Sequence, residues 1–197
     1  MRDFWFDMVT ESMHPFRARS GAATVVVATM NIGYFIRIAR PADFEAVGAV
    51  LLASYSRLLA AHYDRVVLDV ALPFMTSANA ILLASGSYYV AESGTGALVG
   101  CGGWSMAPPG GGEIAPGEGH IRHFAVHPDW LGQKIGTSLL ARCFDDASPG
   151  IRRLYCYSSL NAEPFYRSCG FETIGPIDLP MGQILKFPSV LMKREQS

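Results

Sequence analysis

The order of segments with helix-like and strand-like spacing of apolar residues most constrains how this sequence can fold. Segments with apolar residues at three- and four-residue spacing, typical of helices, alternate with short apolar segments typical of strands. The order matches neither a doubly wound sheet nor a helical bundle, and it predicts an α/β domain whose mixed sheet has helices on both faces. The expected strands are 34–39, 87–92, 97–104, 120–126, 152–157, 170–174 and 183–193, the last interrupted at Pro188; the expected helices are 41–60, 64–71 with a break at Pro73, 78–84, 132–147 and 161–168.

Two neighbouring apolar segments predict the centre of this sheet. Segments 87–92 and 97–104 are joined by the turn sequence Ser-Gly-Thr-Gly at 93–96, so the two strands should pair antiparallel as a hairpin. The later segment 108–119 holds five glycines and three prolines. We expect it to be an exposed loop close to whatever the protein binds.

Length and composition predict one domain preceded by a tail. The chain has 197 residues, of which 50% are hydrophobic and 17% charged, enough apolar material for one packed core. Residues 1–31 show no consistent period, and we expect a poorly ordered N-terminal tail or an upstream extension there. Residues 32–197 are expected to form the domain.

Charge and hydropathy narrow the range of partners. The formal net charge is −1, and the sequence has no block of like charges to attract a nucleic acid or a membrane surface. No apolar segment approaches the roughly 20 residues of a membrane span. The four cysteines include no CxxC pair and are expected to be reduced. These features predict a soluble cytoplasmic protein whose partner is a small molecule or peptide.

A strand, turn and helix at 125–140 carry the first chemical signal. The sequence Ala-Val-His-Pro-Asp-Trp-Leu-Gly-Gln-Lys-Ile-Gly-Thr-Ser-Leu-Leu opens a helix from a turn that contains glycine. Backbone N–H groups are free at the positive end of a helix dipole, so this turn is a candidate phosphate site. Gly136 lies within the first helical turn, where glycine costs about 1 kcal/mol relative to alanine, and close approach of another group would explain it. Neither GxxxxGK[ST] nor GxGxxG occurs, so a Walker or Rossmann loop is excluded.

A second segment, 158–171, together with the first, resembles the GCN5-related N-acetyltransferase (GNAT) superfamily. The family pattern Val-x-Pro followed by a glycine loop is similar to the first segment, and Phe-Tyr-x-x-x-Gly-Phe is similar to the second. The hairpin sequence Tyr-Tyr-Val-Ala-Glu at 88–92 also looks like the family's central hairpin. The matching positions are Val126, Pro128, Gly136, Phe165, Tyr166, Gly170 and Phe171.

The resemblance extends from about residue 34 to residue 193 and implies both a fold and a cofactor. The implied fold is a single α+β domain with a mixed, mostly antiparallel twisted sheet of about seven strands. The implied co-substrate is acetyl-CoA, with its pyrophosphate on the helix-opening loop and its pantetheine arm along strand 120–126. The implied acetyl-CoA residues are Phe124, Ala125, Val126, Leu131, Gly132, Gln133, Lys134, Ile135, Gly136, Thr137, Asn161, Phe165 and Tyr166.

Three positions depart from the family pattern. Leu131 replaces the usual Arg or Gln, and Lys134 replaces a glycine. Lys134 keeps its backbone N–H and adds a cation near the expected phosphate. Ser159 occupies a place often taken by Asn. These departures concern cofactor affinity more than the fold.

Catalysis would require a base for the attacking ammonium and a proton for the departing thiolate. Superposition on the family pattern puts His120 where a glutamate base is often found, and an imidazole with a pKa of about 6.5 suits that task. Glu118 is the alternative base, and a solvated strand end is the structural interpretation of His120. Tyr166 matches the residue that commonly protonates the thiolate in this family.

No metal site is expected. His120 and His123 should face opposite sides of a strand, and His123 and His127 would be about 13 Å apart at 3.3 Å per residue. The expected function is transfer of an acetyl group from acetyl-CoA directly to a primary amine of a small molecule or peptide, in a ternary complex. A non-catalytic acyl-CoA-binding or ligand-sensing module of the same fold is the alternative. The sequence leaves the acceptor open, and both a monomer and a homodimer remain possible.

Overall fold

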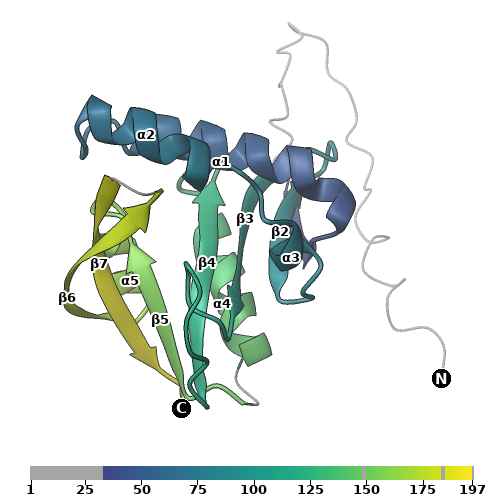
Figure 1. Cartoon of the computed structure of the whole chain (residues 1–197). Helices are drawn as coiled ribbons and strands as arrows, with labels where there is room; N and C mark the ends of the chain where they lie inside the picture. The colour runs from purple at the N-terminus through teal and green to yellow at the C-terminus, as the bar shows by residue number, and fades with distance from the viewer. Residues whose placement is uncertain (1–32, 148–149, 183–184, 197) are drawn as a thin grey trace, which may run out of the picture. The chain divides into compact units, whose positions relative to one another are not determined.

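A seven-stranded sheet forms the centre of the domain in a computed structural model that describes residues 33–147, 150–182 and 185–196 (Figure 1). The strand order is β1-β2-β3-β4-β5-β7-β6, and every neighbouring pair is antiparallel except β4 and β5. The predicted mixed, mostly antiparallel α+β fold is confirmed. The expectation for residues 1–31 falls outside the described residues. The strands are β1 (Tyr34–Ile38), β2 (Tyr88–Ser93), β3 (Leu98–Ser105), β4 (Glu118–Val126), β5 (Arg153–Ser158), β6 (Glu172–Met181) and β7 (Leu185–Glu195).

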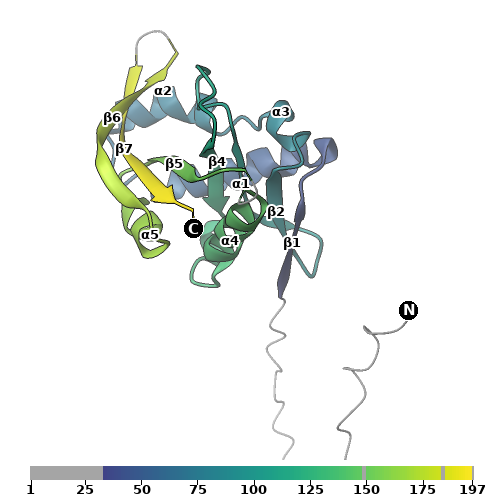
Figure 2. The same ribbon diagram turned by 90° about the horizontal axis from the view of Figure 1, so that it is seen from below.

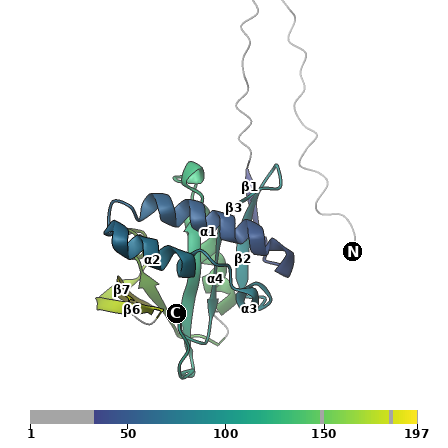
Figure 3. The same cartoon turned by 45° about the horizontal axis from the view of Figure 1, so that its top comes forward.

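Helices cover both faces of the sheet (Figure 2). On one face, α1 and α2 lie side by side across the strands, with the short α3 beyond them (Figure 3). On the other face, α4 packs on the central strands and α5 lies close to β5 and β7. The helices are α1 (Phe44–Leu58), α2 (Arg65–Met75), α3 (Ala80–Leu83), α4 (Ile135–Ala147) and α5 (Glu163–Ser168), with 3₁₀ turns η1 (Pro41–Asp43) and η2 (Pro128–Trp130).

The strand period explains why the core has two parts. Neighbouring residues of β2 point to opposite faces, so Tyr89 packs with Leu139 and Leu140 of α4, whereas Val90 packs with Leu51 of α1. The central strands are buried on both faces, which accounts for their continuous apolar sequences. A separate cluster joins α2 to β7 around Phe187.

The predicted break at Pro73 was wrong, because α2 continues through this residue to Met75. Proline lacks the N–H that would bond to the carbonyl of Asp69, but both residues are exposed, so water can solvate that carbonyl. The last turn is held by Thr76, whose backbone N–H and hydroxyl both donate to the carbonyl of Leu72, each at 2.8 Å.

The predicted interruption at Pro188 was also wrong. β7 is continuous, with Pro188 opposite Asp178 of β6. Pairing between β7 and β5 ends at Val190, so at Pro188 strand β7 is paired only with β6. On the side that faces β5 no hydrogen bond from a backbone N–H is needed, and proline is tolerated there. The Pro188 carbonyl accepts a hydrogen bond from the Tyr63 hydroxyl at 2.9 Å, which ties this part of β7 to the segment that precedes α2.

Gly103 of β3 tests how tightly the β2–β3 ladder is packed. A Cβ there would clash with the Ser87 carbonyl oxygen and lie 2.6 Å from Cα of Tyr88, both backbone atoms that cannot move alone. We expect Gly103→Ala to lower the free energy of unfolding by about 1–3 kcal/mol, measured by urea denaturation. Gly175→Ala is the matched control, since nothing lies within 4 Å of its added Cβ. Equal stability of the two variants would contradict this packing.

Candidate active site

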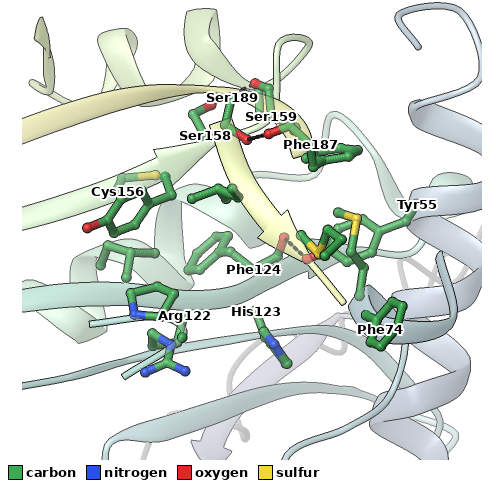
Figure 4. Close-up of a pocket in the computed structure, with 18 of the residues that line it drawn as sticks. Tyr55, Phe74, Arg122, His123, Phe124, Cys156, Ser158, Ser159, Phe187 and Ser189 are labelled. Carbon is green, nitrogen blue, oxygen red and sulfur yellow. Dashed lines mark hydrogen bonds between the residues drawn. The ribbon is translucent and has the colours of Figure 1, made fainter. Parts of the chain in front are cut away.

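The parallel strands β4 and β5 separate after three paired residues. Glu118–His120 pair with Arg153–Tyr155, and the register ends there. We call the opening beyond this point the β4–β5 split. A cavity of about 490 Å³ lies in it, bordered by Ile121–Phe124 of β4 and Cys156–Ser158 of β5 (Figure 4). Tyr55 of α1 and Tyr166 of α5 also border the cavity, so elements from both faces of the sheet meet there.

A β-bulge in β4 shapes the wall of this cavity. Arg122 pairs with Gly103 and Ala125 with Cys101, so His123 and Phe124 together face the single residue Gly102. His123 has a φ of 40°, unusual for a residue with a side chain. Hydroxyl groups hold the bulge: Tyr88 donates to the His123 carbonyl at 2.8 Å, and Tyr55 donates to the Phe124 carbonyl at 3.3 Å.

Gly102 makes room for the ring of the bulged Phe124. A Cβ at Gly102 would overlap that ring. The Phe124 ring in turn contacts Phe165 and Tyr166 of α5, with ring centroids 6.2 and 6.3 Å apart. The bulge therefore positions an aromatic side chain in the β4–β5 split and links it to α5.

Residues 131–137, which we call the anion loop, lead from η2 into α4. Gly132 and Lys134 have φ values of 77° and 61°. The left-handed conformation of Lys134 explains why the family usually has glycine there. Within the described residues, no hydrogen bond uses the backbone N–H groups of 132–137. These groups, at the start of a 13-residue helix, are suited to bind an anion such as phosphate.

Gly136 packs closely against α5 and β4. Its Cβ would lie 3.2 Å from Cζ of Phe165 and 3.7 Å from Cγ2 of Val126. The group predicted to approach Gly136 closely is therefore the Phe165 ring. This contact joins the start of α4 to α5 beside the β4–β5 split.

Tyr166 lies where α5 meets the cavity. It is buried, and its ring packs against the rings of Phe165 and Phe171, with centroids 5.1 and 5.4 Å apart. Burial raises the pKa of the Tyr166 hydroxyl well above its usual value of 10, with Cys156 of β5 as a further cause. The hydroxyl therefore stays protonated at neutral pH and can donate a proton or a hydrogen bond.

The two candidate bases lie on β4 where it is still paired with β5. His120 is buried, and its ring stacks on those of Tyr155 and Tyr157, with centroids 5.6 and 6.0 Å away. Its Nδ1 has no hydrogen-bond partner among the described residues. Desolvation by burial, followed by the charge of Arg122, lowers the pKa of His120 below 6.5. At neutral pH the imidazole is therefore uncharged and free to accept a proton.

Glu118 forms an ion pair and a hydrogen bond with residues of β5. Its carboxylate lies 3.3 Å from Nη1 of Arg153 and accepts a hydrogen bond from the Tyr155 hydroxyl, also at 3.3 Å. Neither Glu118 nor His120 is part of the cavity wall, although Tyr157 beside His120 is. The split brings Phe124 and Tyr166 together, whereas the anion loop lies outside the cavity at the start of α4.

Asn161 and Ser159 form a small polar pair beside this cavity. The Ser159 hydroxyl donates to Oδ1 of Asn161 at 2.8 Å. Ser159 is part of the cavity wall. Ser159 lies between the end of β5 and α5, so a polar side chain is retained where the family often has Asn.

Sequence reasoning missed Arg122, His123 and Tyr55 as cavity residues. It assigned His123 to the strand face opposite His120, which holds only while the two-residue period continues. The bulge interrupts that period at His123, which borders the cavity, whereas His120 does not. Arg122 was open to prediction, because it lies two residues from His120 and shares its strand face. Tyr55 showed only the spacing of a core residue.

Comparison with known proteins relates the central part of this chain to one family. Residues 84–173 match a family model described as an acetyltransferase (GNAT) domain. No curated protein matches the chain. No helix of the described residues has both the length and the apolar character needed to cross a membrane.

Solved structures show the same fold. A GCN5-related N-acetyltransferase from Rhodopseudomonas palustris has a TM-score of 0.66 and 20% identity, over 83% of this chain and 96% of that one. The PaiA N-acetyltransferase from Thermoplasma acidophilum, in complex with coenzyme A, has a TM-score of 0.62 and 18% identity, over 83% and 99%. N-acetylglutamate synthase from Neisseria gonorrhoeae, with coenzyme A and N-acetyl-glutamate, has a TM-score of 0.55 and 22% identity, over 83% of this chain and 35% of that one.

The predicted resemblance is confirmed: residues 84–173 match a GNAT acetyltransferase domain model, and the sheet has the fold of solved GNAT structures.

Proposed function

We propose that the protein transfers an acetyl group from acetyl-CoA directly to a primary amine in a ternary complex. The observation that carries this proposal is the β4–β5 split, whose cavity is bordered by Tyr166 with its buried, protonated hydroxyl. A cavity bordered by elements from both faces of the sheet lets two substrates approach one point from opposite sides. The coenzyme A bound to one structure of the same fold supports acetyl-CoA as the donor.

The residues of the chain fit this donor. Six consecutive backbone N–H groups, 132–137, are available for its pyrophosphate, and the side chain of Lys134 is exposed beside them. We assign the pantetheine arm to β4 at 124–126, where the split removes the neighbouring strand. Phe165 and Asn161 complete the donor side from α5 and the segment before it.

The proposed chemistry needs two proton movements. The amine nitrogen forms a bond to the acetyl carbon as the carbon–sulfur bond breaks, and backbone N–H at Phe124 or Val126 stabilises the developing charge on the acetyl oxygen. A base takes the proton that the amine loses, and the Tyr166 hydroxyl supplies a proton to the departing sulfur. Acetyl-CoA supplies only the activated acetyl group.

We assign the base to His120 in preference to Glu118. An uncharged imidazole with an unpartnered Nδ1 can accept a proton, whereas the Glu118 carboxylate is paired with Arg153. His123 is the alternative that the bulge adds, since it borders the cavity and its Nδ1 is also unpartnered among the described residues. Burial lowers the pKa of His123 to about 4, which makes it a weak base at neutral pH.

Gly136 tests the anion loop. We expect Gly136→Asp to weaken acetyl-CoA binding at least tenfold in calorimetry, because a carboxylate would stand among the N–H groups assigned to phosphate. Gly136→Ala is the matched control, since it makes the same contact with Phe165 without the charge. The alanine variant should bind within threefold of the parent. Equal losses in both variants would mean that packing, and not the anion site, is affected.

Tyr166 tests turnover. Tyr166→Phe keeps the ring packed against Phe165 and Phe171 and deletes only the hydroxyl. An interaction made mainly with the leaving sulfur should lower kcat about 10- to 10³-fold while acetyl-CoA affinity changes less than threefold. Release of coenzyme A in a screen of primary amines is the measurement. A Tyr166→Phe variant with parental kcat would remove Tyr166 from the mechanism. If the parent protein binds acetyl-CoA but releases no coenzyme A with any amine, a non-catalytic module is favoured.

The base is tested by the pH profile of kcat/KM. A base must be deprotonated to act, so activity should fall as pH decreases through its pKa; for His120 that limb lies below pH 6.5. We expect His120→Ala to lower kcat/KM roughly 10²-fold and to remove the limb. Glu118→Gln and His123→Gln should keep it. Loss of the limb in either of these two variants would transfer the role to that residue.

A further inference from the structure

The charged side chains that border the cavity are positive and have no acidic counterpart among the described lining residues. Among the described residues that border it, Arg122 is the one permanent cation, and there is no Asp or Glu. Figure 4 shows Arg122 and His123 next to each other on β4. The rest of the wall is made of hydroxyl groups, the amide of Asn79, and mostly apolar side chains, among them Phe74, Met75 and Phe187.

The Arg122 guanidinium is held in place but not neutralised. Its Nη1 donates to the Ser105 hydroxyl at 2.8 Å and to the Ala107 carbonyl at 3.1 Å. Within the described residues, no carboxylate lies within 4.0 Å of it, and Nε and Nη2 donate no hydrogen bond. Burial lowers the pKa of Arg122 from its usual value, as expected for a cation without an anionic partner.

The free donors have a defined geometry. Nε–H and one Nη2–H of a guanidinium point in parallel and match the two oxygens of a carboxylate. The bonds from Nη1 to Ser105 at the end of β3 and to Ala107 just after it hold the group in place, so little conformational entropy remains to be lost on binding. Arg122 is a half-buried cation, and an anion that arrives with the ligand would compensate its charge.

We propose that the amine acceptor carries a carboxylate and that Arg122 binds it through Nε and Nη2. The acceptor class is then an amino acid or a similar amino carboxylate with an apolar side chain, which the wall around Phe74, Met75 and Phe187 would accommodate. A polyamine or a lysine-rich peptide would bring further cations to a wall without a carboxylate. This inference rests on the proposed function, because it names the acceptor of that same reaction.

A structural role for Arg122 is the competing interpretation. The guanidinium could serve only to hold Ser105 and Ala107. Gln at position 122 can still donate to these oxygens but loses the charge and the parallel N–H pair. A purely structural role predicts that ligands with and without a carboxylate lose affinity equally when Arg122 is changed.

The test is equilibrium binding to the full chain with coenzyme A present. The probes are N-acetyl-L-phenylalanine, N-acetyl-L-leucine and N-acetyl-L-methionine, each compared with its carboxamide by calorimetry. We expect at least one acid to bind tenfold or more tightly than its amide, and Arg122→Gln to abolish that difference. Arg65→Gln, an exposed site on α2, should leave it unchanged. Arg122→Lys should retain part of it, because an ammonium keeps the charge without the fork.

Each outcome decides between the alternatives. Equal binding of acid and amide, equal losses of both in Arg122→Gln, or no binding of any acid would overturn the carboxylate assignment. A separate titration with acetyl-CoA and an assay of coenzyme A release test the proposed function. Selective binding of acids without turnover would support the Arg122 carboxylate site and reject catalysis. Turnover that favours amide acceptors over acids would support catalysis and reject the carboxylate site.

Discussion

The separation of β4 from β5 is the constraint on which the rest of this site depends. Two parallel strands that stayed paired would leave no cavity in the sheet, since each side chain would meet a neighbour at strand spacing. The pairing ends after His120 and Tyr155, and the bulge at His123 and Phe124 follows within three residues. A bulge turns a strand away from its partner and increases its local twist. The positive φ of His123 is the local cost of this opening.

Small residues on neighbouring elements make the split possible. The Phe124 ring occupies the space left by the absent Cβ of Gly102, and the Phe165 ring closes on Gly136. These two glycines bring β3, β4, α4 and α5 close together around the Tyr166 ring. The buried position of the hydroxyl, and hence its raised pKa, follows from this packing and not from a neighbouring charge alone.

The sequence predicted most of the elements because their periods are strong, and it failed where tertiary context outweighs a local rule. Pro73 and Pro188 were read as breaks, yet both stand where the missing N–H costs little: on an exposed helix face and beside a strand paired on one side only. The anion loop and Tyr166 were predicted from family motifs. The bulge was not, because nothing in a strand-like sequence such as His-Ile-Arg-His-Phe-Ala-Val marks where the two-residue period is interrupted.

Sequence reasoning found the proposed donor side of the site more readily than the proposed acceptor side. The proposed donor contacts come largely from backbone groups of a loop and a helix start, whose position a motif can mark. The proposed acceptor wall is assembled from α2, β4, β6 and β7, which are far apart in the sequence. The hydroxyl of Tyr63, just before α2, donates to the carbonyl of Pro188 in β7 and so links two of these elements. The charge of Arg122 acquires a chemical meaning only when this wall is complete, because the absence of an opposing carboxylate is a property of the assembled surface and not of any segment.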